Sequence, residues 1–173
     1  MTFQIKETVR HFLSRDGLDS CGRSLENILA WSDDELEFHH DFIQWLFPLE
    51  QSSGFNSDAP VLTQSECSEL GQDPKVLAGL RDGFNRMLRF YGLECRGTEI
   101  IKSTHWDARC ANWAWAPTHN DLRITRILHS LCLFGLNAEA QSFLRFLENM
   151  DQESSLGSSR RVALAYWQNA VKL

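Results

Sequence analysis

The stretch DPKVLAGLRDGFNRMLRFYG, residues 73–92, decides the fold class. Asp73 is a favourable helix N-cap, Pro74 suits the first helical position, and Gly92 suits the left-handed residue that ends a helix. Apolar residues recur between them at the helical period and form one stripe: Leu77, Leu80, Phe84, Met87, Leu88 and Tyr91. The opposite face is polar: Asp82, Arg86 and Arg89. The sequence therefore predicts a helix over 74–91 that buries its stripe in a core.

Helix signals of the same kind recur along the whole chain. Residues 32–35 form a capping box, which predicts a helix as far as Phe47, because Pro48 cannot continue it. Residues 63–66 repeat the box and predict a second, shorter helix. Further helices are predicted over residues 3–14, 24–30, 120–134, 138–150 and 160–171. The fold class is therefore all-α, with about seven or eight helices in one compact domain over residues 1–173.

Two segments, 50–62 and 96–118, lack the helical period. The second is long for a loop and carries three tryptophans, Trp106, Trp113 and Trp115. Indole rings have a large apolar area to bury, which argues against disorder. We expect one long tryptophan-bearing loop here, with a short strand at Ile100 and Ile101.

The predicted helix over 33–47 is amphipathic. With successive residues about 100° apart, its apolar side consists of Leu36, Phe38, Phe42, Ile43, Trp45, Leu46 and Phe47. Its polar side consists of Glu37, His40, Asp41 and Gln44. His39 falls on the apolar side, so we expect a hydrogen-bonded core histidine. Two adjacent histidines lack the i, i+4 spacing of a helical zinc site, so no metal site is predicted.

The predicted helix over 120–134 is apolar on two sides. One stripe consists of Ile124, Ile127, Leu128 and Leu131, and the other side carries Leu122 and Leu133 beside Arg126 and His129. A helix of this kind is expected to be central, and a partly buried Arg126 then needs a partner. Asn120 is expected to cap this helix.

Charge is segregated along the chain, whose net charge is −6. Residues 24–73 contain eleven carboxylates and no Lys or Arg, whereas residues 74–126 contain nine basic and five acidic residues. Two interpretations are open: the two blocks neutralise one another in the fold, or they line a bipolar ligand groove. Nucleic-acid binding is disfavoured, because it requires an unopposed basic surface.

Composition excludes several classes of protein. A chain of 173 residues with 43% hydrophobic residues can form a soluble core without disulfides. Its five cysteines are an odd number without a C-x-x-C pair, which indicates reduced thiols rather than a disulfide framework or zinc module. Charged residues near the start argue against a signal peptide, and no apolar run approaches the roughly 18 residues of a membrane span. A cytoplasmic or nuclear protein that does not insert into membranes is expected.

Motifs for catalysis and cofactors are also missing from the sequence. Neither Gly-x-Ser-x-Gly nor the glycine-rich phosphate loops occur, so no catalytic residues and no cofactor are predicted. An enzyme that uses His40, Asp41 and His119 as general acid or base is one alternative. A scaffold that docks a partner helix or a second copy through spare aromatic residues is another. The oligomeric state is left open.

Six short segments of the sequence give a resemblance to a known family. They are GRSLE at 22–26, HDFIQWLFP at 40–48, FN and APVL within 55–62, MLRFYG at 87–92 and LRITRIL at 122–128. In this order, over about residues 9–150, they resemble the conserved domain of the opioid growth factor receptor, also called the zeta opioid receptor. The resemblance implies a soluble intracellular receptor that binds the pentapeptide Met-enkephalin, with a nuclear or perinuclear location in animals.

A short zwitterionic peptide needs an anion for its amine, a cation for its carboxylate and an aromatic surface between them. Ten residues are predicted to supply these contacts: His40, Asp41, Gln44, Trp45, Arg86, Trp113, His119, Asn120, Arg123 and Arg126. Asp41 and Arg123 are expected to contribute to peptide binding more than to stability. The alternative is that the same residues form structural ion pairs.

Overall fold

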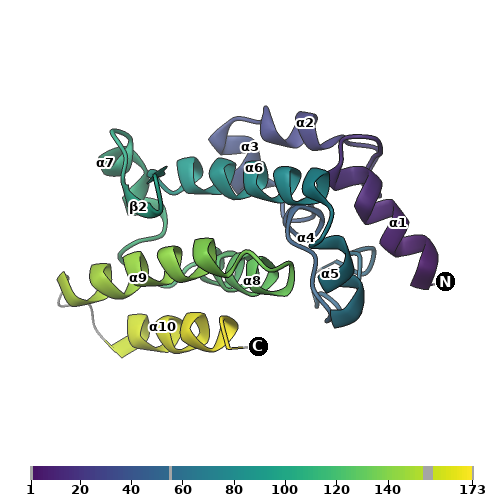
Figure 1. Ribbon diagram of the computed structural model, residues 1–173. Coiled ribbons are helices and arrows are strands. Elements are labelled where there is room, and N and C mark those ends of the chain that lie inside the picture. Colours follow the sequence, from purple (N-terminus) through teal and green to yellow (C-terminus); the bar gives the residue numbers. More distant parts are fainter. Residues whose placement is uncertain (1, 55, 154–157, 173) are drawn as a thin grey trace. The chain divides into compact units, whose positions relative to one another are not determined.

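A computed structural model describes residues 2–54, 56–153 and 158–172 (Figure 1). This part of the chain contains ten α-helices, one 3-10 turn and one two-stranded hairpin. The expected helical fold is confirmed. The helices outnumber the seven or eight expected because the predicted helix over 33–47 divides into two and the predicted loop over 96–118 contains a further short helix.

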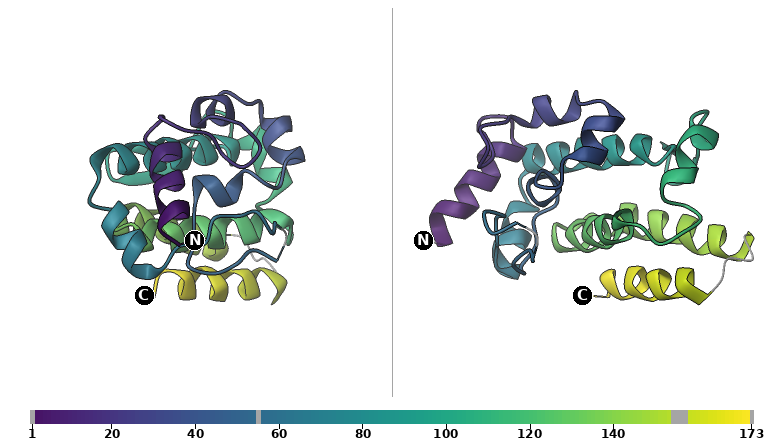
Figure 2. Two further views of the ribbon diagram at one scale, coloured as in Figure 1. Left: turned by 90° about the vertical axis from the view of Figure 1, so that its right-hand side faces the viewer. Right: turned by 180° about the vertical axis from the view of Figure 1, so that it is seen from behind.

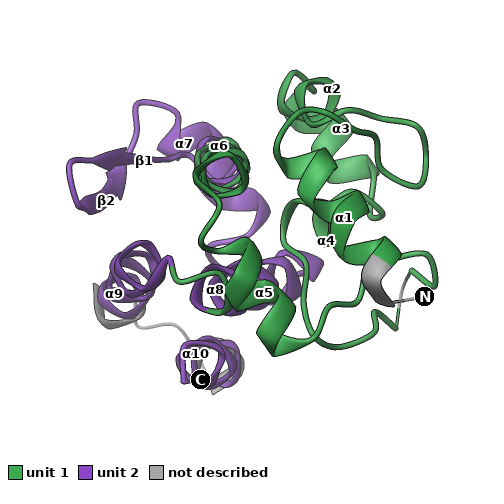
Figure 3. Ribbon diagram, turned by 45° about the vertical axis from the view of Figure 1, so that its right-hand side comes forward, with its two compact units in different colours: residues 1–86, 133–135 green, residues 87–132, 136–173 purple. Residues whose placement is uncertain are grey.

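The chain folds into two compact units, coloured separately in Figure 3. Unit 1 consists of residues 1–86 with 133–135, and unit 2 consists of residues 87–132 with 136–173. The division falls within the long helix that the glycine and proline signals predicted. The expectation that residues 1–173 form a single domain stays a prediction.

Unit 1 is built from short helices. They are α1 (Thr2–Leu13), α2 (Leu25–Leu29), α3 (Asp33–Phe38), α4 (Ile43–Leu46), α5 (Gln64–Leu70) and the first part of α6 (Pro74–Phe90). Both predicted capping boxes are confirmed, because the Ser32 and Thr63 hydroxyls each accept a hydrogen bond from the backbone N–H three residues later. The predicted cap of α6 is confirmed too, since the Asp73 carboxylate accepts from the Lys75 N–H at 2.9 Å.

The continuous helix predicted over 33–47 is wrong, because the backbone turns extended at His39 (φ −84°, ψ 138°). Side-chain amides donate to backbone carbonyls that a continuous helix would use. The Asp41 carbonyl accepts a 3.4 Å hydrogen bond from the Asn56 amide, and the His40 carbonyl accepts one from Gln44. The break separates the expected apolar side: Phe38 is 77% exposed, although the apolar residues of α4 are buried.

His39 is not the core histidine that the helical period predicted. Its ring stacks on Trp31 with centroids 4.7 Å apart, and the side chain remains partly exposed.

Ion pairs join α1 and the segment after it to the acidic block. The Lys6 ammonium lies 3.0 Å from Glu69, and the Arg10 guanidinium lies 2.9 Å from Asp73. Arg15 pairs with carboxylates of α2 and α6. The acidic block therefore finds basic partners within unit 1, and several come from the N-terminal residues rather than from the basic block.

Unit 2 contains the end of α6, a hairpin and three longer helices (Figures 1 and 2). Its elements are β1 (Leu93–Arg96), β2 (Glu99–Lys102), α7 (Trp106–Arg109), the 3-10 turn η1 (Cys110–Asn112), α8 (His119–Leu133), α9 (Asn137–Glu153) and α10 (Ser158–Ala170). Gly92 ends α6 with φ +78°, and Gly135 follows α8 with φ +83°, as their sequence positions predict. In Figure 1, α10 runs alongside α9.

The expected long loop over 96–118 is more structured than predicted. The strand expected at Ile100 and Ile101 is confirmed as β2, and the segment also contains α7 and η1. Trp106 and Trp113 are buried edge to face with ring centroids 6.0 Å apart, whereas Trp115 is 46% exposed. Buried indole area, as the sequence indicates, orders this segment.

The second apolar side of α8 faces α10 within unit 2. The Trp167 indole N–H donates to the Asp121 carbonyl at 3.1 Å, and His129 Nδ1 lies 3.0 Å from the Ala170 carbonyl. Leu122, which was expected on that covered side, is 60% exposed. The N-cap is Thr118, whose hydroxyl accepts from the Asn120 N–H at 3.1 Å, so the prediction that Asn120 caps this helix is wrong.

Candidate functional site

Asp41 lies in a polar cluster at the surface of unit 1. We call the group formed by Asp19, Cys21, Arg23, Trp31 and Asp41 the Asp41 cluster. The segment between α1 and α2 supplies its first three members, and the turns before α3 and α4 supply the other two. Asp41 retains 41% of its side-chain exposure, whereas the Asp19 side chain is fully buried.

Hydrogen bonds fix each charged group of the cluster. Asp19 accepts from the backbone N–H groups of Cys21 and Arg23, and from Arg23 Nε at 2.7 Å. The same guanidinium donates through Nη1 to Asp41 Oδ1 at 3.0 Å, and the Cys21 thiol donates to Asp41 Oδ2 at 3.3 Å. Two carboxylates share one guanidinium, so the cluster is anionic.

The ionisation of Asp41 follows from these contacts. Partial burial acts to raise the pKa of its carboxyl group, but the hydrogen bonds from Arg23 and Cys21 and the Arg23 charge together hold the pKa below its ordinary value. The hydrogen bond to Asp41 is in turn the main reason why the pKa of the Cys21 thiol is raised. Near neutral pH the site therefore presents a carboxylate and a protonated thiol.

Trp31 links the Asp41 cluster to Arg86, another of the predicted site residues. The Arg23 guanidinium lies over its indole ring, 5.2 Å from the centroid, and His39 stacks on the same indole. Its carbonyl accepts a 2.7 Å hydrogen bond from Arg86, which also pairs with Asp33 at 2.9 Å. Arg86 is thus buried in an ion pair and is not on the solvent face that the helical period predicted.

The other predicted unit 1 residues differ in how accessible they are. His40 is exposed next to Asp41. Gln44 is 4% exposed, and its Oε1 is buried without a hydrogen-bond partner among the described residues. Trp45 is 2% exposed, packs edge-on against Phe12 and donates its indole N–H to Ser20. The Trp45 ring therefore belongs to the core and does not offer an accessible aromatic surface to a ligand.

Four of the five predicted residues of unit 2 lie on α8, and Trp113 follows η1. Arg123 is 4% exposed, donates to the Asn120 amide oxygen at 3.4 Å, and lies 6.0 Å from the Phe90 ring centroid. Asn120 Nδ2 is buried without a hydrogen-bond partner in the described part of the chain. Trp113 is buried and donates to the Tyr91 carbonyl at 3.0 Å.

His119 and Arg126 complete the unit 2 set. His119 begins α8 and is exposed, whereas Arg126 lies two turns further on and is partly buried. Of these five predicted residues, only His119 has an exposed side chain, and their role in ligand binding stays a prediction.

Comparison with known proteins identifies the family. The family model described as the opioid growth factor receptor conserved region matches residues 15–173. The chain belongs to the opioid growth factor receptor conserved-region family. It is 39% identical over 158 residues to the opioid growth factor receptor of Homo sapiens and to that of Rattus norvegicus, and each match covers 87% of this chain. Opioid growth factor receptor-like protein 1 of Mus musculus is 31% identical over 161 residues.

The region that matches this chain is only a part of each relative's length. This chain spans 23% of the human receptor, 27% of the rat receptor and 33% of the mouse receptor-like protein. No solved structure matches the chain. In the described residues, no helix combines the length and the apolar character that crossing a membrane would require.

The geometry groups with Asp41 several residues that the sequence analysis did not single out. Four members of the Asp41 cluster, Asp19, Cys21, Arg23 and Trp31, were not predicted as site residues. Arg23 belongs to the GRSLE segment, one of those that carry the family resemblance, and this is the one sequence signal that pointed to Arg23. No signal in the sequence pointed to the other three as members of this cluster.

Proposed function

We propose that this member of the opioid growth factor receptor family is a receptor domain that binds a short peptide, and that Asp41 accepts the peptide's terminal amine. The partly exposed, ionised Asp41 carboxylate is the observation that supports this contact best. A carboxylate offers about four acceptor positions, and Arg23 and Cys21 use two of them. An ammonium group can occupy the remainder.

An aromatic surface adjoins this carboxylate. Phe38 is 77% exposed and lies edge-on to His39, whose ring stacks on Trp31. Trp31 in turn contacts Arg23 of the Asp41 cluster. A peptide with an N-terminal amine and aromatic side chains, such as Met-enkephalin, matches this combination of an anion and exposed rings. Contact of the other predicted residues with the peptide stays a prediction.

An intracellular location is part of the same proposal. All five cysteines are free thiols in the described structure, although two are exposed. Exposed reduced thiols persist in a reducing compartment, which supports a cytoplasmic or nuclear receptor.

Two alternatives receive less support. A general acid or base works best with a pKa near the working pH, whereas Arg23 holds the Asp41 pKa below its ordinary value. A scaffold that docks a partner helix is favoured only by single exposed rings such as Phe38.

The proposal is tested by calorimetric titration of the folded chain with Met-enkephalin. Loss of a charge-assisted hydrogen bond corresponds to about tenfold weaker binding, so we expect Asp41→Asn to raise Kd by about that factor. N-acetylated Met-enkephalin should bind the unmodified chain equally weakly, because acetylation removes the ammonium charge.

Asp34→Asn is the matched control, since Asp34 is an exposed acidic residue of α3 with no hydrogen bond or ion pair in the described structure. It should leave Kd unchanged. Absence of heat with Met-enkephalin would refute peptide binding, and an equal loss in both variants would refute the role of Asp41.

A further inference from the structure

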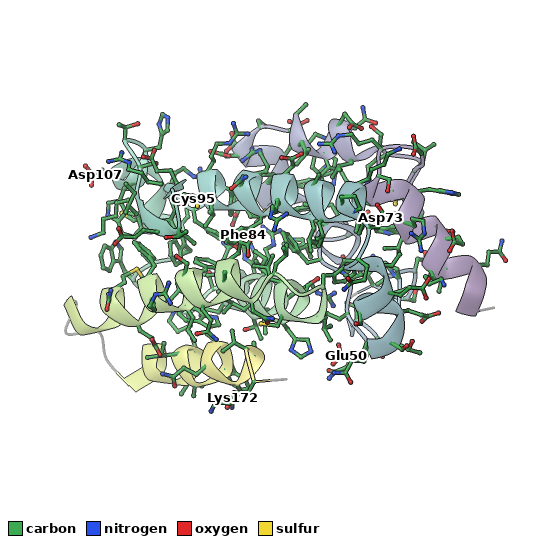
Figure 4. The ribbon with its side chains drawn as sticks, in the orientation of Figure 1. Glu50, Asp73, Phe84, Cys95, Asp107 and Lys172 are labelled. Atoms are coloured by element: carbon green, nitrogen blue, oxygen red, sulfur yellow. The ribbon has the colours of Figure 1, made fainter. Side chains whose placement is uncertain are left out.

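A groove lies between the hairpin and α9, entirely within unit 2. Its volume is about 560 Å³, within the roughly 300–1,000 Å³ typical of ligand sites. Strand β2 forms one wall with residues 99–102. Helix α9 forms the other with Ser142, Arg145, Phe146, Asn149 and Met150. We call it the hairpin groove. Figures 1 and 3 show β2 next to α9, and Figure 4 labels Cys95 on β1 at this end of the unit.

The strand wall presents backbone hydrogen-bonding groups. In an antiparallel pair, residues alternate between those bonded to the partner strand and those facing away from it. The Ser103 N–H donates to the Gly92 carbonyl at 2.9 Å, which fixes this alternation. With Cys95 opposite Ile100, the N–H and C=O of Ile100 point away from β1. Because the described sheet has two strands, β2 has an open edge.

The helix wall presents polar side chains to the same space. Arg145 and Asn149 lie four residues apart, on one face of α9, and both are exposed. The side chain of neither residue makes a hydrogen bond or ion pair with any other described residue. Phe146, between them, is partly exposed and packs edge-on against Trp106. The groove thus combines an apolar floor with an amide and a guanidinium.

The hairpin is anchored to α9 independently of the open edge. The Ser142 hydroxyl donates to the Thr98 carbonyl, in the hairpin turn, at 2.8 Å. This bond joins the hairpin turn to the helix at one end of the groove. It uses neither the N–H nor the C=O of Ile100, so pairing of a ligand with Ile100 does not require this bond to break.

We propose that the hairpin groove binds an extended peptide that carries a carboxylate. The peptide pairs with the open edge of β2 as a third strand, and its carboxylate binds Arg145. Extended chains commonly bind the free edges of sheets in this way, with main-chain bonds for affinity and side-chain pockets for specificity. The charged residues that line the groove are two basic ones, Lys102 and Arg145, and one acidic one, Glu99. The net formal charge of the lining is therefore positive and favours an anionic ligand. This site does not depend on the amine contact at Asp41.

The test uses acetylated tetrapeptides rich in β-branched residues, with free C-terminal carboxylates, titrated into the 15N-labelled full chain. We expect the backbone amide of Ile100 to shift and to become protected from hydrogen exchange. A C-terminal amide should weaken binding about tenfold, because the charge-assisted contact with Arg145 is lost. N-methylation of the pairing residue of the peptide should also abolish the shift, with no change to the protein.

Arg145→Gln should weaken binding by the same factor as amidation of the peptide. Arg89→Gln is the matched control, since Arg89 is an exposed arginine of unit 2 outside the groove. If no peptide of the panel shifts Ile100, or if Arg89→Gln and Arg145→Gln weaken binding equally, the hairpin groove is not the site. Because Asp41→Asn should leave these titrations unchanged, failure here is distinct from failure of the amine contact.

Discussion

At the scale of single residues, the Asp41 carboxylate makes stability depend on pH. Its pKa is depressed in the folded chain despite partial burial, because Arg23 and Cys21 bind the ionised form. A depressed carboxyl pKa stabilises the fold above the unfolded-state pKa, and this contribution is lost as pH falls through the folded-state value. We expect Asp41→Asn to lower the free energy of unfolding at pH 7 by less than about 1 kcal/mol, because the side chain is partly exposed.

Urea unfolding at several pH values checks this expectation. The difference between the unmodified chain and Asp41→Asn should shrink as pH falls below about 4. In an Arg23→Gln background the same substitution should have little effect, because the ion pair is already absent. A difference that stays constant down to pH 3 would contradict the assignment.

At the scale of elements, unit 1 depends on a close approach of α6 to the end of α1. A Cβ atom on Gly79 would lie 2.0 Å from the Leu13 carbonyl oxygen, and backbone cannot move aside as a side chain can. We therefore expect Gly79→Ala to destabilise the fold by about 1–3 kcal/mol, although alanine favours helices. Gly54→Ala is the control, since no atom lies within 4 Å of that Cβ. Equal melting temperatures of the two variants would show that α1 and α6 do not meet as described.

Helix ends were predictable from sequence because local chemistry determines them. Ser32, Thr63 and Asp73 cap their helices through hydrogen bonds that span two or three residues. The break at His39 was not predictable from the helical period, because its surrounding contacts come from outside the predicted helix: His39 stacks on Trp31, and the Asn56 amide donates to the Asp41 carbonyl. The hydrophobic period of a segment contains no information on contacts with residues outside that segment, so it cannot predict where such contacts interrupt a helix.

At the scale of the whole molecule, charge segregation in the sequence corresponds to the two compact units. Unit 1 contains fifteen acidic and seven basic residues, and unit 2 contains eight and ten. The ten predicted ligand residues divide equally between the units. Residue type identified the charged candidates, but which of them are exposed depends on packing. Asp41 is accessible, whereas Arg86 and Arg123 are buried, and no pattern of spacing separates these cases.

Thiol reactivity reports on the packing of both units in one experiment. The thiolate is the reactive form, so burial and a raised pKa both slow modification. Cys21 and Cys95 are exposed, whereas Cys67, Cys110 and Cys132 are buried. Burial raises the pKa of Cys67 to about 12 and also raises that of Cys132. We expect an aromatic disulfide reagent to modify two thiols in the native chain and all five in denaturant.

The two exposed thiols should also differ from one another. Because the Cys21 thiol donates a hydrogen bond to Asp41, which raises the pKa of the thiol, Cys21 should react more slowly than Cys95. Cys95→Ser should remove the fast phase, and Asp41→Ala should accelerate the slower one without exposing the three buried thiols. A native chain in which all five cysteines react at one rate would mean that the cores of unit 1 and unit 2 are not closed around Cys67, Cys110 and Cys132.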